Sequence, residues 1–383
     1  MAASKNRSSE KRAHSGTAGA YIEVACPPGW LAGTQSLWAR SGRPVMDSER
    51  ISQVYVDTRQ APYTGGILRY VREIIPRLNI QQVEFDRPFK PARPIDVINP
   101  NRARIPCSAL LYSPGYSAGV ARCTQLLTIH DLTHLRTQNS RLRWYLNRAY
   151  YEGVVKPAVR RARHVLTVSE TSANDIRDWI NDEDVTVHNA GIGCSSAFTR
   201  EGAECKFDRP YFLYVGNFKA HKNPRTLFEA MASFHDHLLV VVSADVAAAR
   251  ALAEQYGFID RLKIQTAVSD EALAALYRGS DALVFPSRWE GFGLPVLEAL
   301  MTGTNVVYSS AAASVSEICH GGQFAVEDAA DVGEFRRQME LAIDSAFTGL
   351  SDVTQFRWET VASRVQSVIR HVQQLAAVPN RVV

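Results

Sequence analysis

The residues best suited to chemistry lie in one glycine-rich stretch in the second half of the chain. Glu290 and Glu298 are eight positions apart there, with two glycines and a proline between them. An apolar strand pattern ends just before this stretch, and Pro295 suits the first turn of a helix. The start of a helix leaves backbone N–H groups free to bind an anion or hydroxyl groups. Two carboxylates beside it suit a polyol, because each accepts hydrogen bonds from hydroxyl groups. The alternative is two solvated carboxylates and glycines that serve only the turn.

A second cluster lies where a strand pattern ending at Val215 passes through a glycine turn into a helix. Its candidate residues are Gly216, Asn217, Lys219, His221 and Lys222. Cationic side chains at a helix start add to the positive end of the helix dipole, so this cluster could hold a pyrophosphate. On these residues alone, a solvated helix start fits equally well.

Two features of the first half are also placed to meet a ligand. Gly65 and Gly66 stand between a strand and a helix, where the absence of side chains lets a phosphate or sugar approach the backbone. His130 ends an apolar strand, at the edge where open α/β sheets bind ligands. A histidine at a strand end is more often structural. His130 and His134 lack the intervening glutamate on a helix that would favour a zinc site.

Together these stretches resemble the family-4 retaining glycosyltransferases over about residues 51–375. Residues 285–299 resemble the E-x7-E signature, 214–224 the V-G-x-x-x-x-(R/H)-K-N element, 128–132 the T-I-H-D-L element, and Gly65-Gly66-Ile67 the G-G/G-I loop. Weaker landmarks are Ser169-Glu170, Asn189-Ala190-Gly191, Ser316-Glu317 and Phe356-Arg357-Trp358. The resemblance implies an α/β chain with the GT-B fold: two Rossmann-like domains facing across a cleft, and a C-terminal helix that crosses back to the N-terminal domain.

The resemblance also implies roles for the candidate residues. Glu298 would hold the ribose hydroxyls of the donor, and Glu290 would bind the sugar and phosphate with the backbone of the 291–294 loop, namely Gly291, Phe292, Gly293 and Leu294. Lys222 and the Gly65-Gly66 loop would offset charge on the departing diphosphate, and His130 would orient the sugar. His130, Glu290 and Lys222 are therefore the expected catalytic residues. No metal, other cofactor or protein nucleophile is expected.

One motif departs from the family pattern. Where relatives carry an arginine near the lysine, this chain has Asn217 and His221, so the second cationic partner stays open between Lys219 and Arg225.

The predicted function is transfer of a hexosyl unit from a nucleotide-diphosphate sugar, with GDP-mannose slightly favoured, to a hydroxyl of a surface glycan or lipid-linked acceptor. A non-catalytic GT-B scaffold or regulatory partner is the alternative. Ser117 formally completes a G-x-S-x-G motif and keeps a serine hydrolase as a remote alternative. That motif needs a helix directly after the serine, whereas a strand is expected from 125.

The alternation of strand and helix patterns predicts a mostly parallel sheet in each half. Strands are expected at 51–57, 95–98, 109–112, 125–130, 164–168, 185–187, 211–215, 238–242, 262–265, 282–285 and 304–308. Helices are expected at 66–78, 141–161, 172–180, 223–233, 246–256, 270–279, 294–301, 331–346 and 358–374. The predicted parts are a disordered extension at 1–50, an acceptor domain at 51–205, a nucleotide-sugar domain at 206–355, and a crossover helix and tail at 356–383. Met46 just before the first strand raises the hypothesis of a misassigned start.

Length and composition fit this picture. The 383 residues suit two domains plus extra segments, and 46% apolar with 21% charged residues is ordinary globular usage. Of the formal charge of +4, residues 1–50 supply +3, so the remaining chain lacks the excess basic charge expected of nucleic-acid binders. Six scattered cysteines favour a reducing compartment, and a cytoplasmic location is expected.

Two further charged segments have competing interpretations. The helix at 141–163 has seven basic residues and one acidic residue, so it could rest peripherally on an anionic membrane or serve as a scaffold helix with a solvated basic face. No apolar stretch is long enough to cross a bilayer. The D-x-D sequence at 182–184 is interpreted as a solvated helix cap, because no apolar strand precedes it.

Overall fold

The computed structural model describes residues 53–60, 65–85, 90–91, 94–136, 141–350 and 352–375, without the side chain of His134. These residues all belong to one unit of contacting residues, Asp47–Val383. The extension expected at 1–50 lies outside the described residues, as do residues 51–52 of the first expected strand.

The second half of the chain forms a six-stranded sheet in which every pair of neighbours is parallel. Its strands are β7 (Tyr211–Val215), β8 (Leu238–Val242), β9 (Leu262–Gln265), β10 (Ala282–Phe285), β11 (Val306–Ser309) and β12 (Phe324–Val326). Their order is β12-β11-β10-β7-β8-β9, which is the order of a Rossmann fold. The chain reverses its direction of sheet growth between β7 and β10. The carboxyl ends of these two strands are therefore neighbours, and this is the place where such sheets bind ligands.

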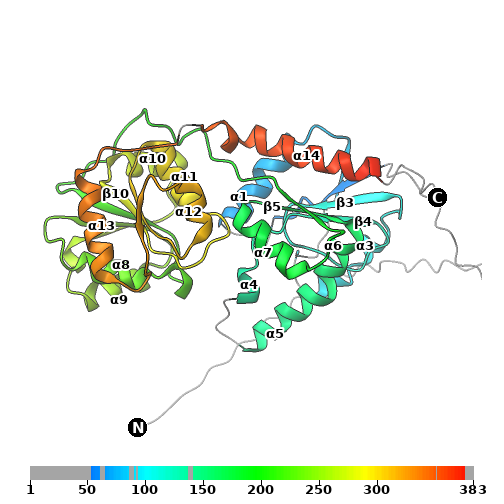
Figure 1. The fold of residues 1–383 in the computed structure, drawn as a ribbon, viewed down its shortest axis with the longest axis horizontal. Coiled ribbons are helices and arrows are strands. Elements are labelled where there is room, and N and C mark those ends of the chain that lie inside the picture. Colours follow the sequence, from blue (N-terminus) through cyan, green and yellow to red (C-terminus); the bar gives the residue numbers. More distant parts are fainter. Residues whose placement is uncertain are drawn as a thin grey trace, which may run out of the picture. The chain divides into compact units, whose positions relative to one another are not determined.

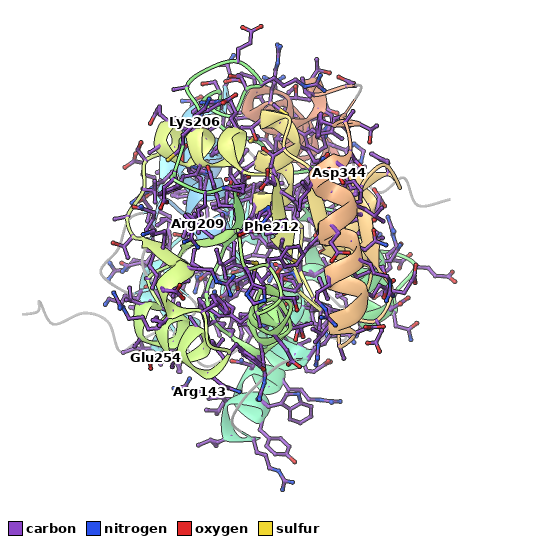
Figure 2. All side chains as sticks on the ribbon, turned by 90° about the vertical axis from the view of Figure 1, so that its left-hand side faces the viewer. Arg143, Lys206, Arg209, Phe212, Glu254 and Asp344 are labelled. Carbon is purple, nitrogen blue, oxygen red and sulfur yellow. The ribbon has the colours of Figure 1, made fainter. Side chains whose placement is uncertain are left out.

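Helices cover both faces of this sheet (Figure 1). They are α8 (Pro224–Met231), α9 (Val246–Gln255), α10 (Asp270–Gly279), α11 (Leu294–Thr302), α12 (Ala313–Cys319) and α13 (Val332–Asp344). Alternate residues of β7 point to opposite faces. Phe212 and Tyr214 pack in one apolar cluster with α8, α9 and α13, whereas Tyr211 and Leu213 pack in the other with α10, α11 and α12. Burial on both faces explains the unbroken apolar runs of these strands. Figure 2 labels Phe212 within this half.

The first half also forms parallel sheet. Its strands are β1 (Gln53–Val56), β2 (Gln82–Glu84), β3 (Ala109–Ser113), β4 (Thr124–Leu127), β5 (His164–Thr167) and β6 (Thr186–Asn189). The order is β2-β1-β3-β4, with β5 and β6 as a separate parallel pair. The backbone N–H of Ile129 donates to Leu166 O at 2.8 Å, so the β5-β6 pair continues the sheet beyond β4.

The longer helices of the first half follow the expected pattern closely. They are α1 (Gly65–Ile74) with a 3-10 turn at Ile75–Arg77, α5 (Arg141–Tyr150), α6 (Lys156–Ala162) and α7 (Glu170–Ile180). A π-helical turn, Tyr151–Val155, joins α5 to α6, so the helix expected at 141–161 is continuous. No helix among the described residues is both long and apolar enough to cross a membrane.

The last helix, α14 (Trp358–Leu375), returns to the first half of the chain. Arg77 donates through Nε to Glu359 Oε1 at 3.0 Å, and the backbone N–H of Asn79 donates to Gln366 Oε1 at 2.7 Å. The Trp358 ring packs edge-on against Tyr70 of α1, with ring centroids 6.0 Å apart. These contacts confirm the predicted crossover helix.

One predicted strand is wrong. Residues 95–98 were expected to form a strand, but Pro94–Val97 forms a single helical turn, α2. Ile95 and Ile98, the two isoleucines behind that expectation, are 57% and 70% exposed, whereas Asp96 between them is buried. Asp96 accepts hydrogen bonds from two arginine side chains, so a buried charge network, not an apolar strand, fixes this segment. The short elements β2, α3 (Pro100–Ala103), α4 (Thr133–Arg136), α12 and β12 were not expected.

Candidate active site

Lys222 and Glu290 meet at the carboxyl ends of β7 and β10. Lys222 ends a 3-10 turn, Ala220–Lys222, that follows β7, and Glu290 lies in the loop after β10. The Nζ atom of Lys222 lies 2.7 Å from Glu290 Oε1, with 15% and 12% of the two side chains exposed. The structure therefore brings two expected site residues together, 68 positions apart in the chain.

The loop that carries Glu290 is held at several points. Ser314 Oγ donates to the backbone oxygen of Glu290 at 2.9 Å, and the backbone N–H of Arg288 donates to His221 O at 2.8 Å. Gly293 has a φ of +107°, which favours glycine, and a Cβ there would lie 3.0 Å from Val315. Helix α11 begins directly afterwards with Pro295 in its first turn, as expected. The backbone of Phe292, Gly293 and Leu294 is thus fixed at the helix start.

Glu298 is 5% exposed, one turn inside α11. Its Oε1 accepts from Arg69 Nη1 at 2.8 Å, and its Oε2 accepts from the Tyr277 hydroxyl at 3.0 Å. Burial raises the pKa of this carboxyl to about 7, although the positive charge of Arg69 opposes the shift. Each carboxylate oxygen keeps a second lone pair, so further hydroxyl groups can still bind.

The Gly65-Gly66 loop faces the 291–294 loop. A Cβ on Gly66 would lie 3.1 Å from Leu294 Cδ1, whereas one on Gly65 would meet none of the described residues within 4 Å. Gly65 also has a φ of +55°, which favours glycine. The structure therefore places the two glycines beside the candidate donor loop.

His130 follows β4 and is 5% exposed. Its Nε2 is 3.0 Å from the backbone oxygen of Pro114, and the Tyr70 ring packs edge-on with centroids 4.8 Å apart. Burial lowers the pKa of His130, so the ring is neutral near pH 7. A Cβ on Gly291 would lie 2.7 Å from Asp131 Oδ2 and 3.1 Å from His130 O. The segment that carries His130 therefore touches the loop that carries Glu290.

Helix α7 holds the same loop from another side. Ser169 Oγ and Ser172 Oγ donate to Gly291 O at 2.7 and 3.0 Å. Glu317 of α12 accepts from the backbone N–H groups of Glu170 and Thr171 at 2.9 and 3.1 Å. Sequence comparison marked residues 169–170 and 316–317 separately, and the structure joins them.

The other residues expected in the cluster at 216–222 lie at the edge of this site. Asn217 and Lys219 are exposed, and the Asn217 side chain accepts from the backbone N–H of Lys219 at 3.2 Å. Burial lowers the pKa of His221, and the nearby Glu290 opposes that shift. Arg225, the other candidate for the second cation, donates instead to the Tyr256 hydroxyl at 3.0 Å.

Two arginines near the site were not anticipated from the sequence. Arg69 of α1 pairs with Glu298 and with Asp270. The guanidinium of Arg136 stacks 3.9 Å from the centroid of the Trp289 ring, beside Glu290, and pairs with Asp175 at 2.7 Å. Arg69 lies four positions after Gly65, and that spacing on a helix is the only sequence signal that could have suggested it.

The structure contradicts the serine hydrolase alternative. Ser117 is 1% exposed, and its hydroxyl donates to Asp96 Oδ2 at 2.8 Å. No helix begins between Ser117 and β4 at Thr124, so the required elbow is missing from this described segment. Asp182 in the D-x-D sequence accepts from the backbone N–H of Asp184 and pairs with Arg160 at 3.1 Å, so it forms a turn after α7, whereas the residue that caps this helix end is Asn181.

Comparison with known proteins gives this geometry a context. Residues 197–350, which include Lys222, Glu290 and Glu298, match the family model described as glycosyl transferases group 1. The chain is 29% identical over 189 residues to the O-antigen chain mannosyltransferase RfbU of Salmonella typhimurium, covering 48% of this chain and 52% of that protein. It is 27% identical over 243 residues to the O-antigen chain mannosyltransferase B of Escherichia coli, covering 56% and 62%. The chain thus spans less than two thirds of the length of these relatives.

The fold has solved counterparts. Sucrose-phosphate synthase from Thermosynechococcus elongatus superposes with a TM-score of 0.59 at 20% identity, covering 85% of this chain and 100% of that one. At this identity the likeness concerns the fold. The chain therefore has the GT-B fold, with two Rossmann-like domains and a returning C-terminal helix, and its residues 197–350 have the sequence pattern of group 1 glycosyl transferases.

Proposed function

We propose that this chain is a retaining glycosyltransferase of the family-4 type, which moves a hexosyl unit from a nucleotide-diphosphate sugar to a hydroxyl group. The pairing of Lys222 with Glu290 carries the proposal, because it lies at the switch point of the second sheet and inside the matched segment. A cation and a carboxylate at that place can bind the phosphate and the hydroxyl ends of such a donor.

Lys222 and the start of α11 would bind the diphosphate. A diphosphate competes with Glu290 for the ammonium group of Lys222, and this competition would free Glu290 to accept hydrogen bonds from the sugar. The backbone of Phe292, Gly293 and Leu294 adds the positive end of the helix dipole. Charge that develops on the leaving diphosphate is stabilised by this arrangement, with the Gly65-Gly66 loop on the other side.

Glu298 and His130 would position the rest of the donor. The ribose hydroxyls would donate to Glu298, which is buried and already oriented by Tyr277. If the neutral His130 ring donates from Nε2 to Pro114 O, its Nδ1 is left as an acceptor for a sugar hydroxyl. Retention would follow front-face attack, in which the leaving phosphate takes the acceptor proton. We assign no protein nucleophile, metal or other cofactor.

The names of two relatives point to mannose as the transferred sugar. The Salmonella and Escherichia coli relatives are named as O-antigen chain mannosyltransferases. We therefore propose GDP-mannose as the donor and a surface glycan or lipid-linked intermediate as the acceptor. The acceptor would bind the 51–205 domain and the donor the 206–355 domain, with residues 356–383 as crossover helix and tail.

We also propose that the enzyme is cytoplasmic and contacts the membrane peripherally. Leu142, Tyr145 and Leu146 of α5 are 68%, 63% and 59% exposed. Arg143, labelled in Figure 2, lies between them, and Arg141 and Arg148 lie on either side of them on the same helix, which extends away from the neighbouring sheet (Figure 1). Exposed apolar groups among basic ones suit an anionic lipid surface. Cosedimentation with phosphatidylglycerol vesicles should fall when Leu142 and Leu146 become serine. A scaffold helix would give no cosedimentation.

A donor screen tests the function. The purified protein is incubated separately with GDP-mannose, UDP-glucose, UDP-galactose and dTDP-glucose, and released nucleoside diphosphate is measured. GDP release from GDP-mannose, abolished by a Lys222→Ala, Glu298→Ala double variant, is the expected result. Absence of release and of binding for every donor would favour the non-catalytic scaffold.

A further inference from the structure

A second region of the first half has the features of a binding site. A pocket of about 420 Å³ opens between β6, α7 and α14. It lies at the carboxyl ends of β5 and β6, since β6 ends at Asn189 and α7 begins just after β5. Open α/β sheets bind ligands at this edge. The pocket contains none of the residues assigned above to the donor.

Two guanidinium groups from different helices line this pocket, Arg177 of α7 and Arg364 of α14. Arg177 is held by the side chain of Asn174 at 2.6 Å and lies 3.8 Å from Glu170 Oε2. Arg364 donates through Nη1 to Ala190 O at 3.3 Å. Each guanidinium has five N–H donors, so these bonds leave donors for a ligand. Two arginines that line one pocket suit the oxygens of a phosphate group.

The other polar groups of the pocket suit hydroxyl groups. Glu170 and Asn189 stand on one side, where Asn189 Nδ2 donates to Glu170 Oε1 at 3.0 Å, and Ser367 stands on α14. A carboxylate, an amide and a hydroxyl together accept and donate the hydrogen bonds that a polyol makes. Val187 and Val368 supply apolar surface. A volume of this size falls in the range of small-molecule sites and is large enough for a hexose that carries a phosphate.

We propose that this pocket binds a phosphorylated carbohydrate, with its phosphate between Arg177 and Arg364 and its hydroxyls on Glu170, Asn189 and Ser367. The same chemistry is found in a free sugar phosphate and in the headgroup of a lipid with a polyol phosphate. The site is separate from the proposed donor site, so binding does not require transfer activity.

The pocket is linked to the candidate active site through α7. Glu170 lines the pocket with its side chain, and its backbone N–H donates to Glu317 of α12. The preceding residue, Ser169, holds Gly291 O beside Glu290. A ligand that draws Arg177 from Glu170 would therefore change a contact at the start of α7, next to the residue that holds Gly291 O.

Isothermal titration with α-D-glucose 1-phosphate tests the proposal for a free ligand. Arg177→Ala and Arg364→Ala should each weaken binding about tenfold or more, since each removes a charge-assisted contact. Arg370→Ala is the matched control, because it removes an arginine of the same helix that donates to Asn79 O outside the pocket. Equal thermal midpoints exclude unfolding as the cause.

A second arm tests a membrane-borne ligand with phosphatidylcholine vesicles that contain phosphatidylinositol. Loss of vesicle binding in Arg364→Ala but not in Arg370→Ala supports the pocket with a lipid headgroup as its ligand. The proposal is overturned if neither probe binds, or if both pocket variants bind as the control does. It is also overturned if Lys222→Ala, and not Arg364→Ala, abolishes sugar phosphate binding, because the ligand then occupies the donor site.

Discussion

Arg69 Nη1 lies 2.8 Å from Glu298 Oε1, so a helix of the first half reaches the carboxylate that the donor ribose is proposed to bind. Arg69 also pairs with Asp270, and its guanidinium lies 5.9 Å from the Phe198 ring centroid. Without ligand, the arginine fills part of the hydrogen-bonding capacity of Glu298. A bound ribose must share that carboxylate with Arg69 or displace Arg69 toward Asp270.

Replacing Arg69 should shift the pH dependence of donor turnover. Burial raises the pKa of Glu298 to about 7, and the charge of Arg69 lowers it. In Arg69→Ala the pKa therefore rises further, and Glu298 becomes ionised only at higher pH. If the ionised form binds ribose, the acidic limb of the kcat/KM profile moves to higher pH by roughly one unit, which lowers activity about fivefold at pH 7 and about tenfold well below it. Kinetics from pH 5.5 to 9 measure this shift.

Two further variants separate charge from structure in that experiment. Arg69→Lys keeps the positive charge and should shift the profile less than Arg69→Ala. Arg72→Ala removes a neighbouring arginine of α1 that donates to Gln60, and it should leave the profile unchanged. An acidic limb that stays in place in Arg69→Ala would show that Arg69 does not control the ionisation of Glu298.

Lys222→Ala should lower kcat/KM for the donor by roughly 2 kcal/mol or more in activation free energy, about thirtyfold. It removes the cation that offsets charge on the leaving diphosphate. Steady-state rates of nucleoside diphosphate release measure the effect. Lys263→Ala, which changes an exposed lysine of β9, serves as the control. Wild-type rates in Lys222→Ala would contradict the assignment of this residue.

Gly291→Ala should impair turnover while the protein stays folded. A Cβ at this position would lie 2.7 Å from Asp131 Oδ2 and 3.1 Å from His130 O. The Asp131 side chain can move, but the backbone oxygen of His130 cannot move freely, so the loop that carries Glu290 must shift. Because a shift of about 1 Å at a reacting centre can cost about a hundredfold, we expect a loss of at least tenfold in kcat.

Gly153→Ala is the matched control for that variant. A Cβ on Gly153 meets no described residue within 4 Å, so activity should not change, and the thermal midpoint should stay the same or rise because alanine is more favourable than glycine inside a helix. Wild-type kcat in Gly291→Ala would mean that the loop adapts without affecting the catalytic groups.

The sequence predicted best those elements whose pattern is local and long. Helix α10 occupies the residues expected for it, 270–279, because Ser269 caps its start and apolar residues repeat at helical spacing. The strand prediction for residues 95–98 was wrong because the two isoleucines of this segment face solvent, while Asp96 is buried among arginines. That arrangement depends on Arg59 and Arg102, which lie in other segments, so no local pattern reveals it.

The candidate site likewise contains residues that the sequence indicates and residues that it does not. Glu290, Glu298 and Lys222 could be identified because each lies in a motif next to a strand end. Arg69 could not, and Glu317 was marked only as a landmark without its partners, because these two residues act on residues 229 and 146–147 positions away, respectively. Such contacts depend on how the two halves pack, and a single sequence does not show that packing.

Glu317 should protect the start of α7 from opening. Its two carboxylate oxygens accept the backbone N–H groups of Glu170 and Thr171, and the Thr171 hydroxyl donates to Oε2 at 3.1 Å. A carboxylate at the first turn of a helix satisfies unpaired donors and interacts favourably with the helix dipole, and together these effects stabilise the helix start by about 1–2 kcal/mol.

Glu317→Ala should therefore speed amide hydrogen exchange at Glu170 and Thr171 about tenfold, and Glu317→Gln should do so less. Glu340→Ala, an exposed change on α13, should leave those two amides unaffected. Equal protection in wild type and Glu317→Ala would mean that the bond between the two halves contributes nothing to the stability of this helix start.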